Sequence, residues 1–280
     1  MYSRNELNVA QHYTQDGFEY ESVRLQEHSP VEYAMMARYL DRWIPDQSIV
    51  IDIGVGVGHY AELLAQRGCK LYLIDIAQKL LDTTYARLKT ANLEQQILGV
   101  LQASATQVVG IATAIADAVL LLGPLYHLCS LEARQEAVRE AARILKPDGI
   151  LIAAGINRLA YFRDLFRNQP EEAAIRQDFH RQLLQDGNVD PEHAPPLGYG
   201  HLTTQAEFLQ LFALEFDPMA IIGVESFSAP FATTIQTLAP EEVEAWMDLV
   251  EVTGQTSEGV MMSDHFLYIG QKKDERSASQ

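Results

Sequence analysis

The chain has 280 residues, of which 48% are hydrophobic and 21% are charged. This length and composition can supply a substantial buried core, which excludes global disorder, and they allow one large domain or two small ones. Its 21 Lys and Arg residues stand against 38 Asp and Glu residues, and the resulting net charge of −17 disfavours a broad nucleic-acid or anionic-membrane surface.

The N-terminal segment MYSRNELNVAQHYTQDG is polar and lacks the apolar stretch of a signal peptide. The longest apolar stretch, 108–125, contains Asp117 near its middle, which a membrane helix would not easily accept. Cys69 and Cys129 have no metal-ligand spacing and are typical of small buried residues in a reducing compartment. We therefore expect a cytoplasmic protein that contacts neither membrane nor nucleic acid.

The first helical pattern follows a polar segment at residues 1–30. Apolar side chains at i, i+3, i+4 and i+7 predict a helix from Glu32 to Trp43, which Pro45 ends. We expect residues 1–45 to form N-terminal cap helices.

From residue 48 the chain alternates strand and helix patterns. Strands are predicted at 49–53, 70–75, 97–102, 117–122 and 150–155, with helices at 59–67, 78–91 and 131–145. The end of the chain returns to strands at 219–226 and 264–270, around a helix at 240–252. Continuous apolar strands separated by helices indicate a sheet covered on both faces. The sequence therefore predicts an α/β, Rossmann-like fold over residues 46–280, with seven mostly parallel strands and an antiparallel last strand.

The regular alternation breaks after the fifth predicted strand, between residues 156 and 216. This segment is helical in places and contains the loop DGNVDPEHAPPLGYGH, which is too rich in Pro and Gly to be core. A long segment of this kind inside a domain is usually a lid or a binding insertion. We expect 156–216 to be a helical substrate lid.

The strongest local motif is VIDIGVGVG, a strand that runs into a glycine turn and a helix. Glycines permit positive φ and close approach of a ligand, although the same pattern also serves as a plain tight turn. Asp75 ends the next strand, 21 residues after Gly54, where an acid can accept both hydroxyls of a ribose. The spacing G-x-G-x-G, with Asp52 two residues before the first glycine, differs from the G-x-G-x-x-G of dinucleotide enzymes.

At this point the chain resembles a known family. VIDIGVGVGHYAELLAQRG followed by LYLID resembles motif I and the acidic loop of class I S-adenosylmethionine-dependent methyltransferases. DAVLLLGPLYHL and REAARILKPDGILIAAG are similar to later motifs of their type 11, small-molecule branch. The resemblance covers residues 12–165 and continues more weakly through 198–212 and DHFLYIG. It implies methyl transfer from S-adenosylmethionine to a small molecule by in-line displacement, which releases S-adenosylhomocysteine.

The resemblance also implies roles for single residues in cofactor binding. Gly54, Gly56 and Gly58 would line the methionine end of the cofactor. Asp52 would help to hold the ammonium group, and Asp75 would bind the ribose. For Asp75 the alternative is an ordinary loop carboxylate.

For the adenine and the sulfonium group of the cofactor, the resemblance implies binding residues with less specific sequence signals. Ser104 and Ala105, after the third strand, would meet the adenine, although Ser104 also suits a helix cap. The family commonly has an acid where Ser104 stands, and a serine accepts a hydrogen bond more weakly. Leu122 and Gly123 would pass beneath the sulfonium. Arg24 would bind the methionine carboxylate or form a surface salt bridge.

For the methyl acceptor the sequence offers candidates rather than a motif. His127 follows the fourth strand at the ligand-binding edge and would suit a general base, or an imidazole fixed by a backbone partner. Tyr126, Asn157, Arg158 and His201 are the candidate substrate contacts. We expect all five to converge on one cavity next to the methyl group.

No metal-ligand constellation stands out, so we expect a metal-independent enzyme. Two other functions remain open at this point. One is an NAD-dependent oxidoreductase on a similar sheet, and the other is a non-catalytic accessory protein with the methyltransferase fold. The identity of the acceptor and the oligomeric state are beyond the sequence.

Overall fold

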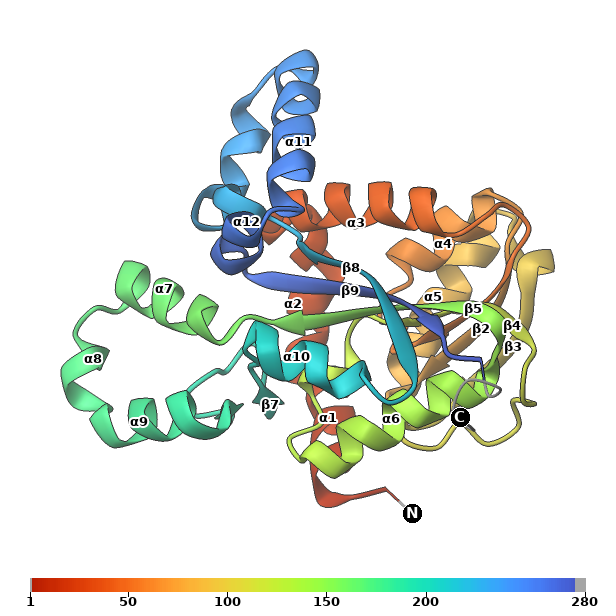
Figure 1. The fold of residues 1–280 in the computed structure, drawn as a ribbon, viewed down its shortest axis with the longest axis horizontal. Helices are drawn as coiled ribbons and strands as arrows, with labels where there is room; N and C mark the ends of the chain where they lie inside the picture. The colour runs from red at the N-terminus through yellow and green to blue at the C-terminus, as the bar shows by residue number, and fades with distance from the viewer. Residues whose placement is uncertain (1, 275–280) are drawn as a thin grey trace.

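A computed structural model describes residues 2–274, and one seven-stranded sheet forms its centre (Figure 1). The strands are β1 (Ile49–Ile53), β2 (Lys70–Asp75), β3 (Ile97–Gln102), β4 (Ala116–Leu121), β5 (Leu145–Ile156), β8 (Phe216–Gly223) and β9 (His265–Lys272). Their order is β3-β2-β1-β4-β5-β9-β8, and β9 is antiparallel to both of its neighbours. The predicted fold class is confirmed. The last six residues of the predicted 46–280 domain lie outside the described part.

Strand β5 begins earlier than predicted, because the KPDG turn lies inside it. Leu145 pairs with Ala116 of β4, whereas Ile150 pairs with Ala118, so the turn forms a bulge between the two pairs. Asp148 in this bulge has a φ of +62°. The bulge lies at the start of β5, whereas the pocket described below lies at the carboxyl ends of the strands.

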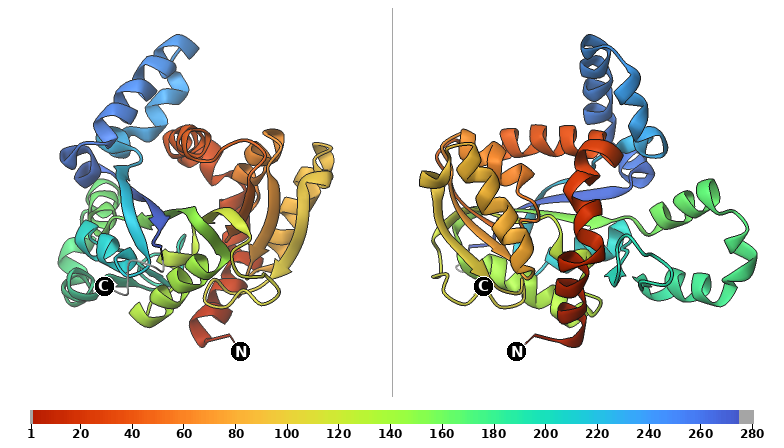
Figure 2. Two further views of the ribbon diagram at one scale, coloured as in Figure 1. Left: turned by 45° about the vertical axis from the view of Figure 1, so that its right-hand side comes forward. Right: turned by 180° about the vertical axis from the view of Figure 1, so that it is seen from behind.

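Helices cover both faces of the sheet (Figure 2). One face is covered by α3 (Pro30–Trp43), α4 (His59–Gln66) and α5 (Gln78–Thr90), and the other by α6 (Leu131–Ile144) and α10 (Gln205–Phe212). Each face has its own apolar core. Met35 and Tyr39 of α3 are fully buried in the same cluster as Val50 of β1. Helix α3 is therefore a core element, although it belongs to the segment predicted as an N-terminal cap.

The chain before α3 lies across the carboxyl ends of the strands. It forms α1 (Arg4–Thr14), α2 (Asp16–Val23) and a short π-helix, η1 (Arg24–His28). The right-hand view of Figure 2 shows these helices as a red column in front of the end of the sheet. This position places α1, α2 and η1 over the edge where ligands bind in open α/β sheets.

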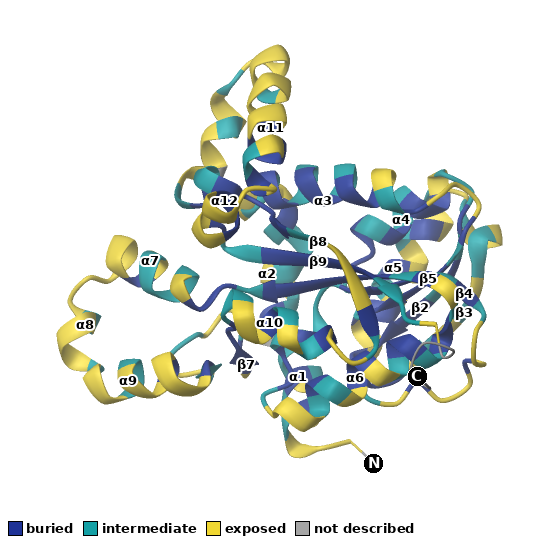
Figure 3. Ribbon diagram, in the orientation of Figure 1, coloured by how far each residue is buried: buried dark blue, intermediate teal, exposed yellow. Residues whose placement is uncertain are grey.

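The segment after β5 projects sideways from the sheet (Figure 1). It consists of α7 (Arg158–Asn168), α8 (Glu172–Ile175), α9 (Gln177–Asp186) and a hairpin of β6 (Asn188–Val189) and β7 (Gly200–His201). Much of its surface is exposed (Figure 3), but Leu183, Val189 and Leu202 form a small core. The predicted insertion is too long at its end, because α10 packs on the sheet and leads into β8.

A second projection stands between β8 and β9. It contains the 3-10 segment η4 (Ser226–Thr237), α11 (Pro240–Gly254) and α12 (Ser257–Met262), where the sequence predicted one helix. Arg38 of α3 forms ion pairs with Glu244, Asp248 and Glu251 of α11, which attach this projection to the core. Among the described residues, no helix is long and apolar enough to cross a membrane.

Candidate functional site

The glycine turn after β1 is held against β2 by its backbone. The N–H groups of Gly54 and Val55 both donate to Ile74 O, at 2.8 and 3.0 Å. Gly54, Gly56 and Gly58 have φ values of +83°, +59° and +82°, a region that disfavours other residues. All three positions therefore need glycine on conformational grounds.

The three glycines differ in what surrounds them. A Cβ atom on Gly54 would lie 2.6 Å from Pro124 Cδ, and one on Gly58 would lie 2.6 Å from Thr84 Cγ2. A Cβ on Gly56 would meet only Glu21 Oε1, at 3.7 Å. Packing of the protein thus occupies the space at Gly54 and Gly58, whereas the backbone at Gly56 faces open space.

That space is a pocket between the glycine turn and the N-terminal helices. Its walls come from the turn, from the loops after β2, β3 and β4, and from α1, α2 and η1. All the residues predicted to bind the cofactor line this pocket: Arg24, Asp52, Gly54, Gly56, Gly58, Asp75, Ser104, Ala105, Leu122 and Gly123. Of the acceptor candidates, Tyr126 and His127 also line it.

Two buried acids lie at the floor of the pocket. Asp75 accepts hydrogen bonds from the N–H groups of Gly56, at 3.1 Å, and Ala77, at 2.9 Å. Burial raises the pKa of Asp75 to about 6, although these backbone donors oppose the shift. Burial, assisted by the charge of Asp75, raises the pKa of Asp52 to about 7. Both carboxyl groups line the pocket, where they can accept hydrogen bonds from a cationic or hydroxyl-bearing ligand.

Arg24 enters the pocket with two acidic partners. Its Nε donates to Glu21 at 3.0 Å, and its Nη1 donates to Glu32 at 2.6 Å. Burial opposes the charge of Arg24, but the two glutamates raise the pKa of Arg24 well above its ordinary range. Arg24 is thus a half-buried cation that two glutamates fix beside the pocket, rather than a surface salt bridge.

Two residues that line this pocket each have a buried polar atom without a hydrogen-bond partner among the described residues. These atoms are Nε2 of His59 and Oη of Tyr60, both buried, in the first turn of α4. Buried polar groups in folded proteins are nearly always hydrogen-bonded. Together with the open backbone at Gly56, these atoms fit a pocket built for a polar ligand that carries several hydrogen-bonding groups.

His127 is held from both sides. Its Nδ1 lies 3.1 Å from Tyr199 O, a carbonyl that can only accept, so Nδ1 carries the proton. Its Nε2 then accepts from Tyr13 Oη at 2.8 Å. Burial lowers the pKa of His127 to about 4, despite the hydrogen bond with Tyr199. The imidazole is therefore neutral at physiological pH and orients Tyr13 over the pocket.

The remaining acceptor candidates lie elsewhere. Asn157 caps α7 by accepting from Leu159 N and donates to Met261 O and Ser263 O. Arg158 is 5% exposed and is hydrogen-bonded in the base of the insertion. Both side chains are used in structural contacts, because the chain leaves the sheet at this point.

His201 lines a second cavity, which lies between α6, α10 and the base of the insertion. Burial lowers the pKa of His201 to about 4, and its Nδ1 lies 3.2 Å from Asn188 Oδ1. Tyr126 lines both cavities. The expectation of one cavity for all five candidates is therefore wrong: His127 faces the first, His201 faces the second, and Tyr126 lies between them.

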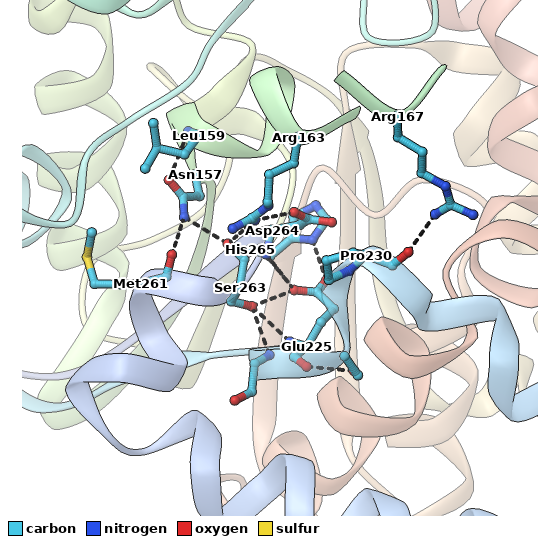
Figure 4. Close-up of polar contacts among 12 residues, drawn as sticks. Asn157, Leu159, Arg163, Arg167, Glu225, Pro230, Met261, Ser263, Asp264 and His265 are labelled. Atoms are coloured by element: carbon cyan, nitrogen blue, oxygen red, sulfur yellow. Dashed lines mark hydrogen bonds and ion pairs between the residues drawn. The ribbon is translucent and has the colours of Figure 1, made fainter. Parts of the chain in front are cut away.

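A polar cluster that the sequence analysis missed lies at the same edge of the sheet (Figure 4). His265, the first residue of β9, donates through Nδ1 to Glu225 Oε1 at 2.5 Å. Glu225 also accepts from Ser263 Oγ at 2.6 Å. Glu32 Oε2 lies 3.9 Å from His265 Nδ1 and binds Arg24, so a chain of ion pairs runs from this cluster to the pocket.

The charges in this cluster compensate one another. Burial lowers the pKa of His265, but Glu32 and Glu225 outweigh it and raise the value to about 9. Burial alone would raise the pKa of Glu225, but His265 and the hydrogen-bond donors outweigh it and hold this pKa well below its ordinary value. Ligand atoms of Glu32, Glu225 and His265 lie within 4.8 Å of one another, as in a metal site. Each already has a protein partner, so we interpret the group as ion pairs that fix Arg24.

Two further pocket residues, Glu6 and Tyr60, also escaped the sequence analysis. Glu6, Val9 and Tyr13 recur at i, i+3 and i+7 on α1, and all three line the pocket. This helical spacing is visible in the sequence and indicates that one face of α1 lines the pocket. Glu225 and His265 are 40 residues apart, and no local pattern marks them as a pair.

Comparisons with known proteins agree with this geometry. The model of the family described as a methyltransferase domain matches residues 51–153. "Putative methyltransferase YqeM" of Bacillus subtilis (strain 168) is 26% identical over 128 residues, which are 46% of this chain and 49% of that protein. The match thus spans about half the length of this curated relative.

Solved structures are similar over nearly the whole chain. Geranyl diphosphate C-methyltransferase from Streptomyces coelicolor A3(2), a complex with Mg²⁺, geranyl diphosphate and S-adenosyl-L-homocysteine, has a TM-score of 0.61 at 14% identity. The similarity covers 97% of this chain and 99% of that one. Burkholderia thailandensis 1,6-didemethyltoxoflavin-N1-methyltransferase, with its acceptor and S-adenosylhomocysteine bound, has a TM-score of 0.59 at 14% identity. That similarity covers 98% of this chain and 92% of that one.

The sheet order, the glycine turn and Asp75 agree with the domain match, which begins inside β1 and ends inside β5. The solved structures extend the likeness in fold to nearly the whole chain. Residues 51–153 thus match a methyltransferase domain, and the chain as a whole has the fold of solved S-adenosylmethionine-dependent methyltransferases.

Proposed function

We propose that this protein binds S-adenosylmethionine in the pocket under its N-terminal helices and transfers the methyl group to a small-molecule acceptor. The observation that carries the proposal is the joint lining of one pocket by Gly56, Asp75 and the loops after β3 and β4. The matched methyltransferase domain supports the same function.

Each end of the cofactor has a candidate partner in this pocket. Asp75 would accept from the ribose hydroxyls, and its charge strengthens those bonds. Arg24 would bind the methionine carboxylate, since the ion pairs with Glu21 and Glu32 fix its guanidinium. Asp52 would compensate the ammonium group, and Tyr60 Oη would gain the hydrogen-bond partner that the protein does not supply.

The cofactor supplies an electrophilic methyl group, and the chain supplies alignment and exclusion of water. Leu122 and Gly123 form the wall beside the glycine turn. The N-terminal helices close the pocket from the opposite side, so they would keep water from the reacting atoms. We expect turnover to persist in the presence of EDTA, because the proposed chemistry uses no metal ion.

We propose that His127 positions Tyr13 and is not the general base. An imidazole with a pKa near 4 is a weak base at neutral pH, and its Nε2 already accepts from Tyr13. If the role is positioning, Tyr13→Phe and His127→Ala should lower kcat to a similar extent, and the double variant should lose little more. A general base at His127 would instead make His127→Ala far more damaging than Tyr13→Phe.

A small molecule is the favoured acceptor for two reasons. The relatives of known structure named above act on geranyl diphosphate and on 1,6-didemethyltoxoflavin, and both are small molecules. The net charge of −17 also disfavours a nucleic-acid substrate. Tyr126 and His127 are the proposed contacts near the methyl group, and the second cavity beyond Tyr126 offers further space on that side.

The proposal is tested by turnover with methyl-labelled S-adenosylmethionine and a panel of oxygen, nitrogen and carbon acceptors. We expect equal amounts of S-adenosylhomocysteine and a labelled acceptor by mass spectrometry. Cofactor binding without turnover on any acceptor would favour the accessory protein. Binding of NADH in place of S-adenosylhomocysteine would favour the oxidoreductase.

A further inference from the structure

The loop after β3 departs from its family at Ser104, where an acid is common. In this structure the Ser104 hydroxyl donates a hydrogen bond to Glu6 Oε1 and accepts one from Thr106 N at 3.1 Å. Thr106 Oγ1 lies 2.9 Å from the same hydroxyl oxygen. These contacts use the donor and the acceptor positions of Ser104, so its hydroxyl is already committed within the protein.

Glu6 brings a carboxylate to the same place from another part of the chain. It lies on α1, 98 residues before Ser104, and is 8% exposed. Its Oε1 accepts from Ser104 and from Thr106 Oγ1 at 3.2 Å, and its Oε2 accepts from Ser3 N at 2.6 Å. A carboxylate has about four acceptor positions, so three are used and one on Oε2 remains.

Apolar side chains line the same pocket as Glu6 and suit the faces of a purine. They are Val9 on the next turn of α1, Leu80 at the start of α5 and Ala103. Burial alone would raise the pKa of Glu6, but the hydrogen bonds from Ser104, Ser3 and Thr106 outweigh it and lower the pKa below its ordinary value. The side chain is therefore ionised at neutral pH and can only accept hydrogen bonds.

We propose that Glu6 supplies the adenine-binding carboxylate that the loop after β3 lacks, and that Ser104 and Thr106 hold it for the exocyclic amine. This inference rests on the proposed function, because it requires the adenosine moiety in this pocket. It makes α1 a part of the cofactor site, so binding of adenine would also fasten the N-terminal helices over the pocket.

An ionised carboxylate selects a 6-amino purine over a 6-oxo purine. The amine of adenine donates a hydrogen bond, whereas the oxygen of hypoxanthine would face the negative charge of Glu6. A charge-assisted hydrogen bond of this kind corresponds to roughly 10- to 100-fold in affinity. Wild-type protein should therefore bind S-adenosylhomocysteine more tightly than S-inosylhomocysteine by about this factor.

The test is isothermal titration calorimetry with both ligands on the full chain. Glu6→Gln and Glu6→Ala should weaken S-adenosylhomocysteine binding and reduce its preference over S-inosylhomocysteine. Ser3→Ala is the matched control, since Ser3 and Glu6 form the capping box of α1. This variant removes the side-chain half of the cap and keeps the carboxylate, so it should retain the adenine preference.

A rescue variant separates recognition from a structural role. Ser104→Asp in the Glu6→Ala background places an acid at the usual position and should restore the adenine preference. The proposal is overturned if folded Glu6 variants keep wild-type affinity and selectivity, or if Ser3→Ala loses the selectivity equally. If wild-type protein binds neither ligand, the proposed function itself fails, which is a different result from unchanged binding in the Glu6 variants.

Discussion

Gly56 and Gly58 lie two residues apart in one turn, and a Cβ atom added to each would meet different surroundings. Gly56→Ala would extend into the pocket, with no contact closer than 3.7 Å, whereas Gly58→Ala would collide with Thr84 at 2.6 Å. We expect Gly56→Ala to remain folded and to lose roughly tenfold or more in S-adenosylhomocysteine affinity, because its methyl group occupies ligand space. Gly58→Ala should instead lower the free energy of unfolding by about 1–3 kcal/mol.

Urea unfolding and calorimetry on both variants check this prediction. The positive φ of both residues imposes a similar conformational cost, so each variant serves as the control for the other. Equal loss of stability with unchanged affinity in Gly56→Ala would mean that the ligand does not approach this backbone.

The pKa of Asp75 predicts how cofactor binding depends on pH. Burial raises this pKa to about 6, so the side chain is ionised above pH 6 and protonated below it. The charge-assisted contact with the ribose is thus available above pH 6 and is lost as the pH falls. We expect the dissociation constant of S-adenosylhomocysteine to rise by up to about tenfold per pH unit below pH 6.

Calorimetry between pH 7.5 and 5 measures this dependence. Asp75→Asn should bind weakly at pH 7.5 and should remove the part of the pH dependence that Asp75 causes. A wild-type profile that the substitution leaves unchanged would place the ribose elsewhere or assign the titration to Asp52, whose pKa is about 7.

At the scale of the element, the base of the insertion depends on Arg158 at the start of α7. Its guanidinium donates to Leu202 O at 3.0 Å, to Leu184 O at 3.1 Å and to Glu207 at 2.6 Å. Arg158→Ala would leave the buried Leu202 O and the part-buried Leu184 O without this donor, so we expect a loss of about 2–4 kcal/mol in the free energy of unfolding. Chemical denaturation measures this loss, and cofactor affinity should change little.

The sequence had suggested a substrate contact for Arg158, and the same variant distinguishes the two roles. Arg167→Ala is a suitable control, because Arg167 lies on the same helix and contacts only an exposed carbonyl of Pro230 among the described residues. Unchanged stability together with a higher KM for the acceptor would show that Arg158 contacts the substrate and is not a structural residue.

The regular elements were predictable because their signals are local. The strands β1 to β4 and the helices between them follow from continuous apolar runs and from helical spacing, to within two residues of the structure. The second projection was only partly predictable: α11 has a helical pattern, but its position depends on ion pairs with Arg38, 206 to 213 residues away.

The residues of the site likewise divide into those that a local sequence pattern predicts and those that it does not. The glycine turn and Asp75 carry a spacing that can be read from the chain, and they line the pocket. The contact of Glu6 with Ser104 and that of His265 with Glu225 join segments 98 and 40 residues apart, which no local pattern reveals. His127 follows β4, as its place in the sequence requires, but its two hydrogen-bond partners come from α1 and from the insertion.

At the scale of the whole molecule, three separate segments surround the carboxyl ends of the strands. Residues of the N-terminal helices line the pocket. Figures 1 and 2 show these helices at one end of the sheet, with the two projections standing out from the same end. Hydrogen bonds join these segments, among them that from Arg167 of α7 to Pro230 O of η4. Such an arrangement suits a site that must open to exchange cofactor and acceptor and then close for methyl transfer.

The central claim is that this pocket binds the cofactor of a methyltransferase. Isothermal titration calorimetry of the purified chain with S-adenosylhomocysteine, and separately with NADH, tests it most directly. We predict saturable binding of S-adenosylhomocysteine at one site per chain, weakened in Asp75→Asn, and no binding of NADH. Binding of NADH without S-adenosylhomocysteine, or S-adenosylhomocysteine binding that Asp75→Asn leaves unchanged, would contradict the account.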